Sequence, residues 1–170
     1  MEVWEAIRSR RNVREFTAEP IPGPDLDQIL EAARLTPSSR NRQAWDFVVV
    51  TDRERLAALA GVWRGAGHVG GAAAAIVIVL PEDADGSSNW LYYDAGQATM
   101  SLMVAAAGLG IGTAHAAVED QALAQEILGY PGGYFSGALI SLGYPADRPL
   151  APIRKPNRRP FAEVIHRERW

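Results

Sequence analysis

The sequence predicts one domain in which a central β-sheet is covered by helices, and three observations support this. A chain of 170 residues, 48% hydrophobic and 22% charged, suits a single globular domain over residues 1–170. Helical and strand patterns alternate along it, with no repeat and no linker-like stretch between them. Two helical patterns precede the first strand pattern, which is atypical of a doubly wound parallel fold.

The elements are expected in a definite order. Residues 2–10 carry Val3, Trp4 and Ile7 at helical spacing, and Pro24 opens a second helix that ends at Pro37. Aromatic and β-branched residues predict a strand over 45–50. The remaining expected elements are a helix over 52–59, a strand over 72–80 buried on both faces, a helix over 89–107, a strand over 111–116, a helix over 119–128, a strand over 135–142 and a basic tail.

The helix expected over 89–107 is apolar over most of its circumference. A helix of this kind must be buried, and in so small a domain the expected place is a subunit interface. Ala95, Ala98 and Ala105 are small enough to let a partner helix approach closely.

Composition excludes several kinds of chemistry. Without cysteine there are no disulfides, thiolate metal sites or thiol nucleophiles. His68, His115 and His166 lie about 50 residues apart with no carboxylate at ligand spacing, so no metal site is expected. The apolar run over residues 70–80 is about half of the ~20 residues that span a bilayer, and the first residues are not a signal peptide. We expect a cytoplasmic protein with no membrane contact.

The charges are unevenly distributed. Seven basic and two acidic residues give residues 148–170 a net charge of +5, which leaves −8 for residues 1–147 out of a total of −3. A basic tail on an acidic body suits a phosphate-bearing ligand, a partner subunit or nucleic acid. Nucleic acid is the weakest of these, because the arginines are not interleaved with aromatic residues, and no nucleic-acid partner is expected.

Two arginine clusters lie at opposite ends of the chain. Residues 8–14 contain four arginines, of which Arg10, Arg11 and Arg14 could hold a phosphate bidentately, with Asn12 on a neighbouring hydroxyl. The alternative is a solvated helix end whose arginines complement the helix dipole. Residues 154–160 form the second cluster, which could meet the first at one phosphate or could simply be solvated.

Two loops are candidate ligand sites. Residues 36–43 offer Ser38, Ser39, Asn41 and Gln43 as donors and acceptors for a heterocycle, although Pro-Ser-Ser is also a common helix terminator. Residues 108–113 are glycine-rich but follow a helix, and a threonine replaces the third glycine, so a flexible turn is expected there instead of a dinucleotide fingerprint.

Taken in order, these segments resemble the nitroreductase family of flavin enzymes. The motifs that carry the resemblance are Arg-Arg-Asn-Val-Arg at 10–14, Pro-Ser-Ser-Arg-Asn-Arg-Gln-Ala-Trp-Asp-Phe at 37–47, an alanine-rich helix ending in Gly-Leu-Gly at 94–110, Leu-Gly-Tyr-Pro at 142–145 and Arg-Arg-Pro at 158–160. The resemblance covers essentially the whole chain, and five motifs in the same order are specific.

The resemblance implies an α+β fold with a mixed, mainly antiparallel sheet flanked by helices, in an intertwined homodimer. It also implies FMN at the subunit interface and ping-pong transfer of electrons from NAD(P)H to a nitroaromatic, quinone or similar small acceptor. Backbone N–H groups of the segment 115–117 would lie near the flavin, and some residues of the segment 37–41 would come from the second subunit. The cofactor-binding residues that it implies are Arg10, Arg11, Asn12, Arg14, Pro37, Ser38, Ser39, Asn41, His115, Ala116, Ala117 and Arg158.

The chain departs from the family pattern at several positions. Asn12 and Ala44 replace the usual serine and proline, and Pro156 stands where a basic residue is usual. Residues 61–71, where larger members contact the ring, show no matching contact, and the insertions that form a substrate lid are missing.

No side chain resembles a nucleophile or a general base, which agrees with a flavin that carries the redox step itself. The function expected is therefore that of an FMN-dependent oxidoreductase with no catalytic side chain of its own. Two alternatives are an FMN-storage protein without turnover and a sensor of a phosphate-bearing ligand.

Overall fold

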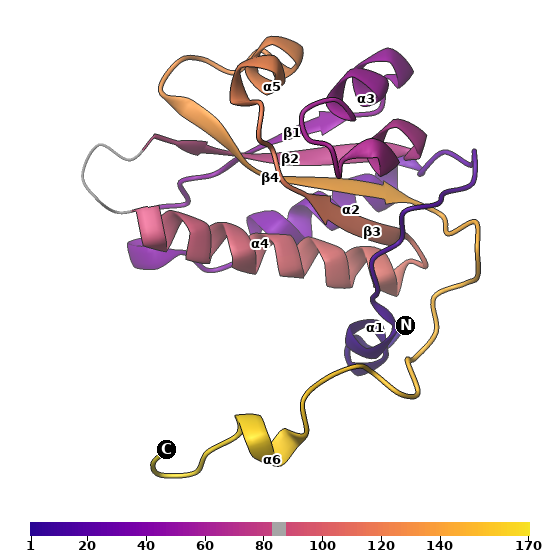
Figure 1. Ribbon diagram of the computed structural model, residues 1–170, viewed down its shortest axis with the longest axis vertical. Helices are drawn as coiled ribbons and strands as arrows, with labels where there is room; N and C mark the ends of the chain where they lie inside the picture. The colour runs from indigo at the N-terminus through magenta and orange to yellow at the C-terminus, as the bar shows by residue number, and fades with distance from the viewer. Residues whose placement is uncertain (83–87) are drawn as a thin grey trace.

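The computed structural model describes residues 1–82 and 88–170, which form an antiparallel sheet between two layers of helices (Figure 1). The strand order is β1-β2-β4-β3, and all three strand pairs are antiparallel. This confirms the α+β class and the predominantly antiparallel sheet. The strands are β1 (Asp46–Val50), β2 (Ala74–Pro81), β3 (Gly112–Ala116) and β4 (Tyr134–Gly143).

The helices are divided between the two faces of the sheet. Figure 1 shows α2 and α4 on one face, and α3, α5 and the short helix η2 on the other. Among the described residues, no helix is long and apolar enough to cross a lipid bilayer. The helices are α1 (Val3–Ser9), α2 (Gly23–Arg34), η1 (Ser39–Asn41), α3 (Arg53–Leu59), η2 (Gly67–Gly71), α4 (Ser88–Gly108), α5 (Gln121–Leu128) and α6 (Phe161–Val164).

Strand β2 lies in the middle of the sheet and is buried on both faces, as its continuous apolar sequence predicts. Because side chains alternate along a strand, Ile76 and Ile78 pack toward α2 and α4, whereas Val77 and Val79 pack toward α3 and α5. The sheet therefore separates two apolar cores, one under each layer of helices.

Helix α4 corrects one detail of the expected interface. Ala95 and Ala98 are buried in the core of their own chain, so they do not face outward to receive a partner helix. The outward face carries large exposed side chains instead, namely Trp90, Tyr92, Tyr93 and Met100. Helix α4 thus packs against α1, α2 and the sheet, and its exposed positions lie within residues 89–100.

The C-terminal tail leaves the body of the molecule after passing α1 (Figure 1). The backbone N–H of Ile153 donates a hydrogen bond of 3.0 Å to the carbonyl oxygen of Arg8, which joins the two ends of the chain. Beyond this contact the tail forms the four-residue helix α6, which the sequence did not predict, and leaves Phe161 and Trp170 exposed.

Candidate functional site

The N-terminal arginine motif follows α1 and lies beside β3. Asn12 forms a parallel bridge with Thr113, and the N–H of Val13 donates to the carbonyl oxygen of Thr113 at 3.0 Å. Val13 is buried against Gly112, where an added Cβ would lie 2.6 Å from Cγ2 of Val13. The missing side chain of Gly112 therefore allows the arginine motif to pack against the edge of the sheet.

Three of the polar side chains in this motif are already engaged. Arg11 donates to the Asp147 carboxylate at 2.6 Å and to the carbonyl oxygen of Arg148 at 2.9 Å. The hydrogen bond from Arg11 lowers the pKa of Asp147. Arg10 donates from Nη1 to Oδ1 of Asn12 at 3.3 Å. Arg14 is exposed, which leaves its guanidinium open to a ligand.

A cavity of about 480 Å³ lies between α4 and the end of β3, within the size range of small-molecule and cofactor sites. It brings together Arg10 and the segment 115–117, which the sequence placed in one site. The other lining residues are Gly96, Thr99, Met100, Met103, Gly137 and Ala138. A Cβ at Gly96 would meet no atom within 4 Å, so this glycine leaves room beside the cavity.

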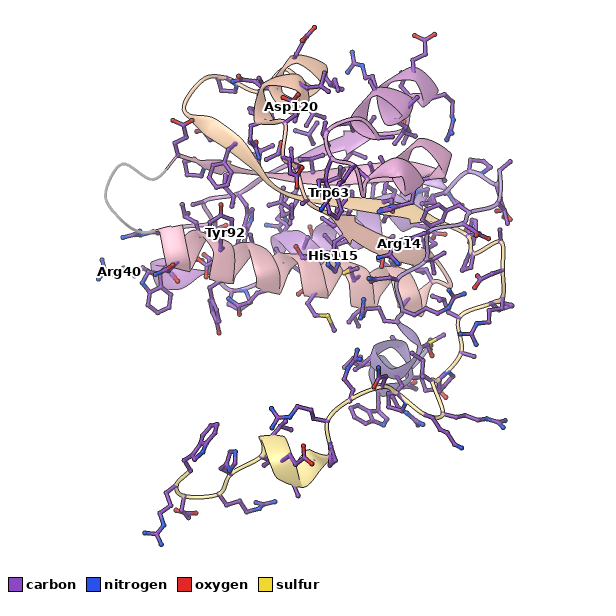
Figure 2. All side chains as sticks on the ribbon, viewed as in Figure 1. Arg14, Arg40, Trp63, Tyr92, His115 and Asp120 are labelled. Carbon is purple, nitrogen blue, oxygen red and sulfur yellow. The ribbon has the colours of Figure 1, made fainter. Side chains whose placement is uncertain are left out.

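The backbone of β3 adds polar groups to this cavity. Strand β3 is at the edge of the sheet, and the carbonyl oxygen of Thr113 points outward, since it accepts from Val13. Peptide groups alternate sides along a strand, so the N–H of His115, two residues later, points to the same outer edge. Figure 2 shows His115 and Arg14 in this part of the molecule. The predicted role of the segment 115–117, to offer backbone donors, is compatible with this geometry.

The second predicted group, Pro37, Ser38, Ser39 and Asn41, lies in the loop that contains η1. The backbone N–H of Ser39 donates to Oδ2 of Asp94 at 2.8 Å, and its hydroxyl donates to Oδ1 at 3.2 Å. Asp94 is only 6% exposed and also accepts from Nε2 of Gln97 at 3.4 Å. A buried carboxylate near the start of α4 therefore fixes the loop.

The backbone of this loop is strained. Arg40, Asn41 and Gln43 have φ values of 54°, 55° and 50°, in the left-handed region that costs a non-glycine residue about 1–2 kcal/mol. The loop is closed by hydrogen bonds from Asn41 N to Ser38 O at 2.9 Å and from Gln43 N to Ser38 Oγ at 2.9 Å. Strain of this kind is characteristic of ligand clamps and active sites.

Within one chain, the two predicted groups do not meet. The loop binds α4 at Asp94, and none of its predicted site residues lines the cavity with Arg10. Figure 2 shows Arg40 beyond one end of α4, far along the helix from His115. The two groups of predicted site residues are therefore separate within a single chain.

The last predicted residue, Arg158, is exposed in the tail. Its Nη1 donates to the carbonyl oxygen of Asn157 at 2.8 Å. The two arginine clusters come close through the contact between Ile153 and Arg8, and the cavity beside β3 is lined by Arg10 but not by Arg158.

Sequence reasoning missed Asp94 and the cavity-lining residues of α4. Asp94 is the only charged residue within 89–107, and an isolated carboxylate in an apolar helix is a signal that could have identified it. Gly96, Thr99 and Met103 carried no such signal, because spacing alone does not tell which face of α4 meets the sheet.

Residues 61–71, which matched no ring contact, contribute a half-buried histidine, His68, instead. Nδ1 of His68 lies 2.9 Å from Oγ of Ser141, whose hydroxyl donates to the carbonyl oxygen of Ala114 at 3.2 Å, so His68 is the donor in the first contact. Its Nε2 is buried with no partner among the described residues. Burial, followed by the charges of Arg14 and His115, lowers the pKa of His68.

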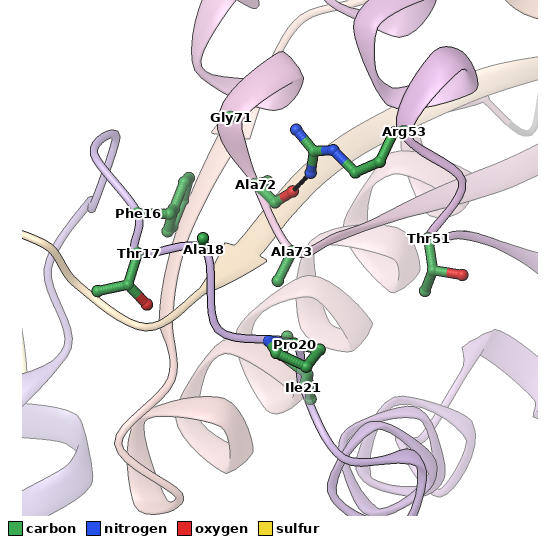
Figure 3. Close-up of a pocket in the computed structure, with 10 residues that line it drawn as sticks. All are labelled: Phe16, Thr17, Ala18, Pro20, Ile21, Thr51, Arg53, Gly71, Ala72 and Ala73. Atoms are coloured by element: carbon green, nitrogen blue, oxygen red, sulfur yellow. Dashed lines mark hydrogen bonds between the residues drawn. The ribbon is translucent and has the colours of Figure 1, made fainter.

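A larger hollow of about 600 Å³ lies elsewhere, between the segment 16–21 and the start of α3 (Figure 3). The guanidinium of Arg53 donates to the carbonyl oxygens of Gly70 and Ala72, which ties it to the wall. None of the predicted site residues lines this hollow. Its volume alone gives no reason to place the function there.

The protein is of the α+β class, with an antiparallel sheet and one long helix, α4. Its candidate site is a cavity between this helix and the edge strand β3. Residues 7–65 match the Nitroreductase family. A protein of Archaeoglobus fulgidus, named for NADH dehydrogenase and NAD(P)H nitroreductase activities, is 33% identical over 174 residues that cover 99% of each chain. The chain therefore belongs to the nitroreductase family.

Solved structures agree with this assignment. An FMN-dependent nitroreductase of Clostridium difficile superimposes with a TM-score of 0.85 at 26% identity, over 97% of this chain and 98% of the other. A Desulfovibrio desulfuricans structure described as a nitroreductase in complex with FMN superimposes with a TM-score of 0.82 at 30% identity, over 100% and 98% of the two chains.

Proposed function

We propose that this chain is an NAD(P)H-dependent oxidoreductase that binds FMN in the cavity between α4 and β3. The observation that carries the proposal is that three features meet at this cavity. They are the Arg10 side chain, the outward-pointing backbone N–H of His115 and the open space at Gly96. The names of the relatives, which include NAD(P)H nitroreductase and FMN-dependent nitroreductase, support the same cofactor and electron donor.

The residues of the cavity suit the parts of FMN. Met100, Met103 and Ala138 offer apolar surface for a planar ring, and the N–H of His115 can donate to a ring acceptor. Arg10 and Arg14 can bind the phosphate, with Asn12 on the ribityl chain and Arg11 held nearby by Asp147. Bound FMN supplies the redox chemistry, accepting electrons from a nicotinamide and passing them on. The protein orients both partners and needs no proton-transferring side chain of its own.

The site is proposed to be completed by a second copy of the chain, in a homodimer of single domains spanning residues 1–170. None of Pro37, Ser38, Ser39 and Asn41 lines the cavity that contains Arg10 in the same chain. The exposed face of α4 around Met100 and the exposed apolar residues of the tail supply surface for a partner. A dimer would bring the loop of one chain to the cavity of the other, and Arg158 to the phosphate.

Turnover is proposed to be ping-pong, with NAD(P)H and a small nitroaromatic or quinone acceptor using the same open face in turn. One open cavity is lined by both Arg10 and His115, and it offers the position that the two substrates would occupy in turn. Initial rates measured at several acceptor concentrations should give parallel double-reciprocal plots. Intersecting plots would contradict the shared position.

The direct test is anaerobic titration of the purified protein. We expect a flavin absorbance spectrum that bleaches when NADH or NADPH is added and returns with a nitroaromatic, a quinone or oxygen. Flavin that is present but never bleached would indicate storage. A colourless protein that does not take up added FMN would exclude both roles and leave a phosphate-ligand sensor.

A further inference from the structure

The strained loop and the start of α4 together line a second cavity, of about 400 Å³, which shares only Ser39 with the cofactor-binding residues assigned above. Its lining residues are Ser39, Arg40, Arg42 and Trp90. Two exposed guanidiniums and one exposed indole thus face the same space, on an otherwise acidic chain body.

The aromatic wall of this cavity is suited to stacking. Trp90 is 60% exposed, although large aromatic side chains are usually well buried. Its ring is held edge to face by Tyr93, with centroids 6.1 Å apart and planes at 84°. This contact orients the indole and leaves most of it open to a planar ring.

The cationic wall is held in place by the backbone. The left-handed conformation at Arg40 persists because Ser39 is anchored on buried Asp94 and Ser38 closes the turn onto Gln43. Arg42 follows with ordinary helical angles and lines the same cavity. Neither guanidinium pairs with a carboxylate within residues 1–82 and 88–170.

We propose that Arg40, Arg42 and Trp90 form a subsite for a planar aromatic ring that carries an anionic group, which stacks on the indole and pairs with the guanidiniums. The subsite rests on the proposed function, because the same loop is proposed to reach the flavin of the partner subunit. Two substrates have this chemistry: the adenosine of NADPH with its 2′-phosphate, and an aromatic acceptor with a carboxylate. The subsite makes the enzyme prefer the substrate that carries the additional anionic group. It should prefer NADPH to NADH, and an aromatic acceptor with a carboxylate to one without it.

Binding to the purified dimer, measured by calorimetry and by quenching of tryptophan fluorescence, tests this subsite without turnover. The probes are 2′,5′-ADP against 5′-AMP, and 4-nitrobenzoate against nitrobenzene. The double variant Arg40→Asn/Arg42→Gln removes both charges, and asparagine tolerates the left-handed angle at position 40. Arg34→Gln is the matched control, since Arg34 pairs with Glu31 on the exposed face of α2.

We expect the wild type to bind 2′,5′-ADP, 4-nitrobenzoate or both about tenfold tighter than the counterpart that lacks the additional anionic group, as two charge-assisted contacts allow. In the double variant this preference should fall below about threefold, while Arg34→Gln keeps it. If the double variant loses only the preference for 2′,5′-ADP, the ligand of the subsite is the nucleotide. If it loses only the preference for 4-nitrobenzoate, the ligand is the acceptor. Loss of both preferences indicates a shared subsite.

No preference in the wild type, or an unchanged preference in the double variant, overturns the subsite. The proposed function fails differently, by the absence of FMN binding or of bleaching with NAD(P)H. Circular dichroism and FMN content of each variant show whether a lost preference reflects only a misfolded loop, and a loss accompanied by unfolding counts against the subsite.

Discussion

The backbone N–H and the hydroxyl of Ser39 both donate to the carboxylate of Asp94, at 2.8 and 3.2 Å. The two residues are 55 positions apart, and their contact joins the loop before β1 to the start of α4. The loop contains three non-glycine residues in the left-handed conformation, so it would relax without this anchor.

Asp94→Ala should therefore destabilise the protein and disorder the loop. Ser39 would lose an acceptor for its buried N–H, which costs about 1–3 kcal/mol of the free energy of unfolding. Urea unfolding followed by circular dichroism measures this loss. Glu126→Gln, at an exposed position on α5, should change the free energy by less than about 0.5 kcal/mol. Equal stabilities of the two variants would mean that Asp94 does not anchor the loop.

Arg14→Ala and Arg158→Ala should each weaken FMN binding about tenfold or more, because a hydrogen bond to a charged group contributes about 1.5–3 kcal/mol. Quenching of FMN fluorescence on binding gives the dissociation constants. Arg34→Ala should retain the wild-type constant. If only Arg14→Ala weakens FMN binding, the tail lies away from the phosphate. If neither variant weakens FMN binding, both arginine clusters are solvated surface.

Met100→Glu should shift the protein from dimer to monomer in sedimentation velocity. Met100 is 43% exposed on the outward face of α4, where a new charge would be desolvated in the proposed interface at a cost of several kcal/mol. Arg55→Glu, on the opposite layer of helices, should leave the dimer intact. Ala98→Glu is unsuitable for this test, because position 98 is fully buried in the chain's own core. A wild-type monomer with bound flavin would contradict the interface.

Stability should fall on acidification through His68. Burial lowers the pKa of this histidine below its usual 6.5, so the folded protein keeps it neutral at a pH where the unfolded chain is protonated. The contribution is complete above pH 6.5 and is lost as the pH falls from there through the folded pKa. His68→Gln should flatten this part of the stability profile, whereas His166→Gln, in the exposed tail, should preserve it.

The elements of the fold follow largely from local sequence. Continuous apolar residues predicted β2, and the expected bounds of the other main helices and strands agree with the structure within a few residues. The residue types in the arginine motif and in the serine-rich loop indicated an anionic heterocyclic ligand before any geometry was known. Helix α6 was not predicted, because four residues in a basic tail carry no periodic signal.

The sequence alone determined where donors, charges and apolar periodicity occur, because these are properties of short segments. Tertiary structure decided which of them meet, since packing sets contacts between distant residues. Packing turned Ala98 into the core and Met100 outward, paired Arg11 with Asp147 across 136 positions, and placed Ser39 on Asp94. It also left the predicted residues of the Ser39 loop outside the cavity that Arg10 lines, and this is the physical reason to expect that two chains share one site.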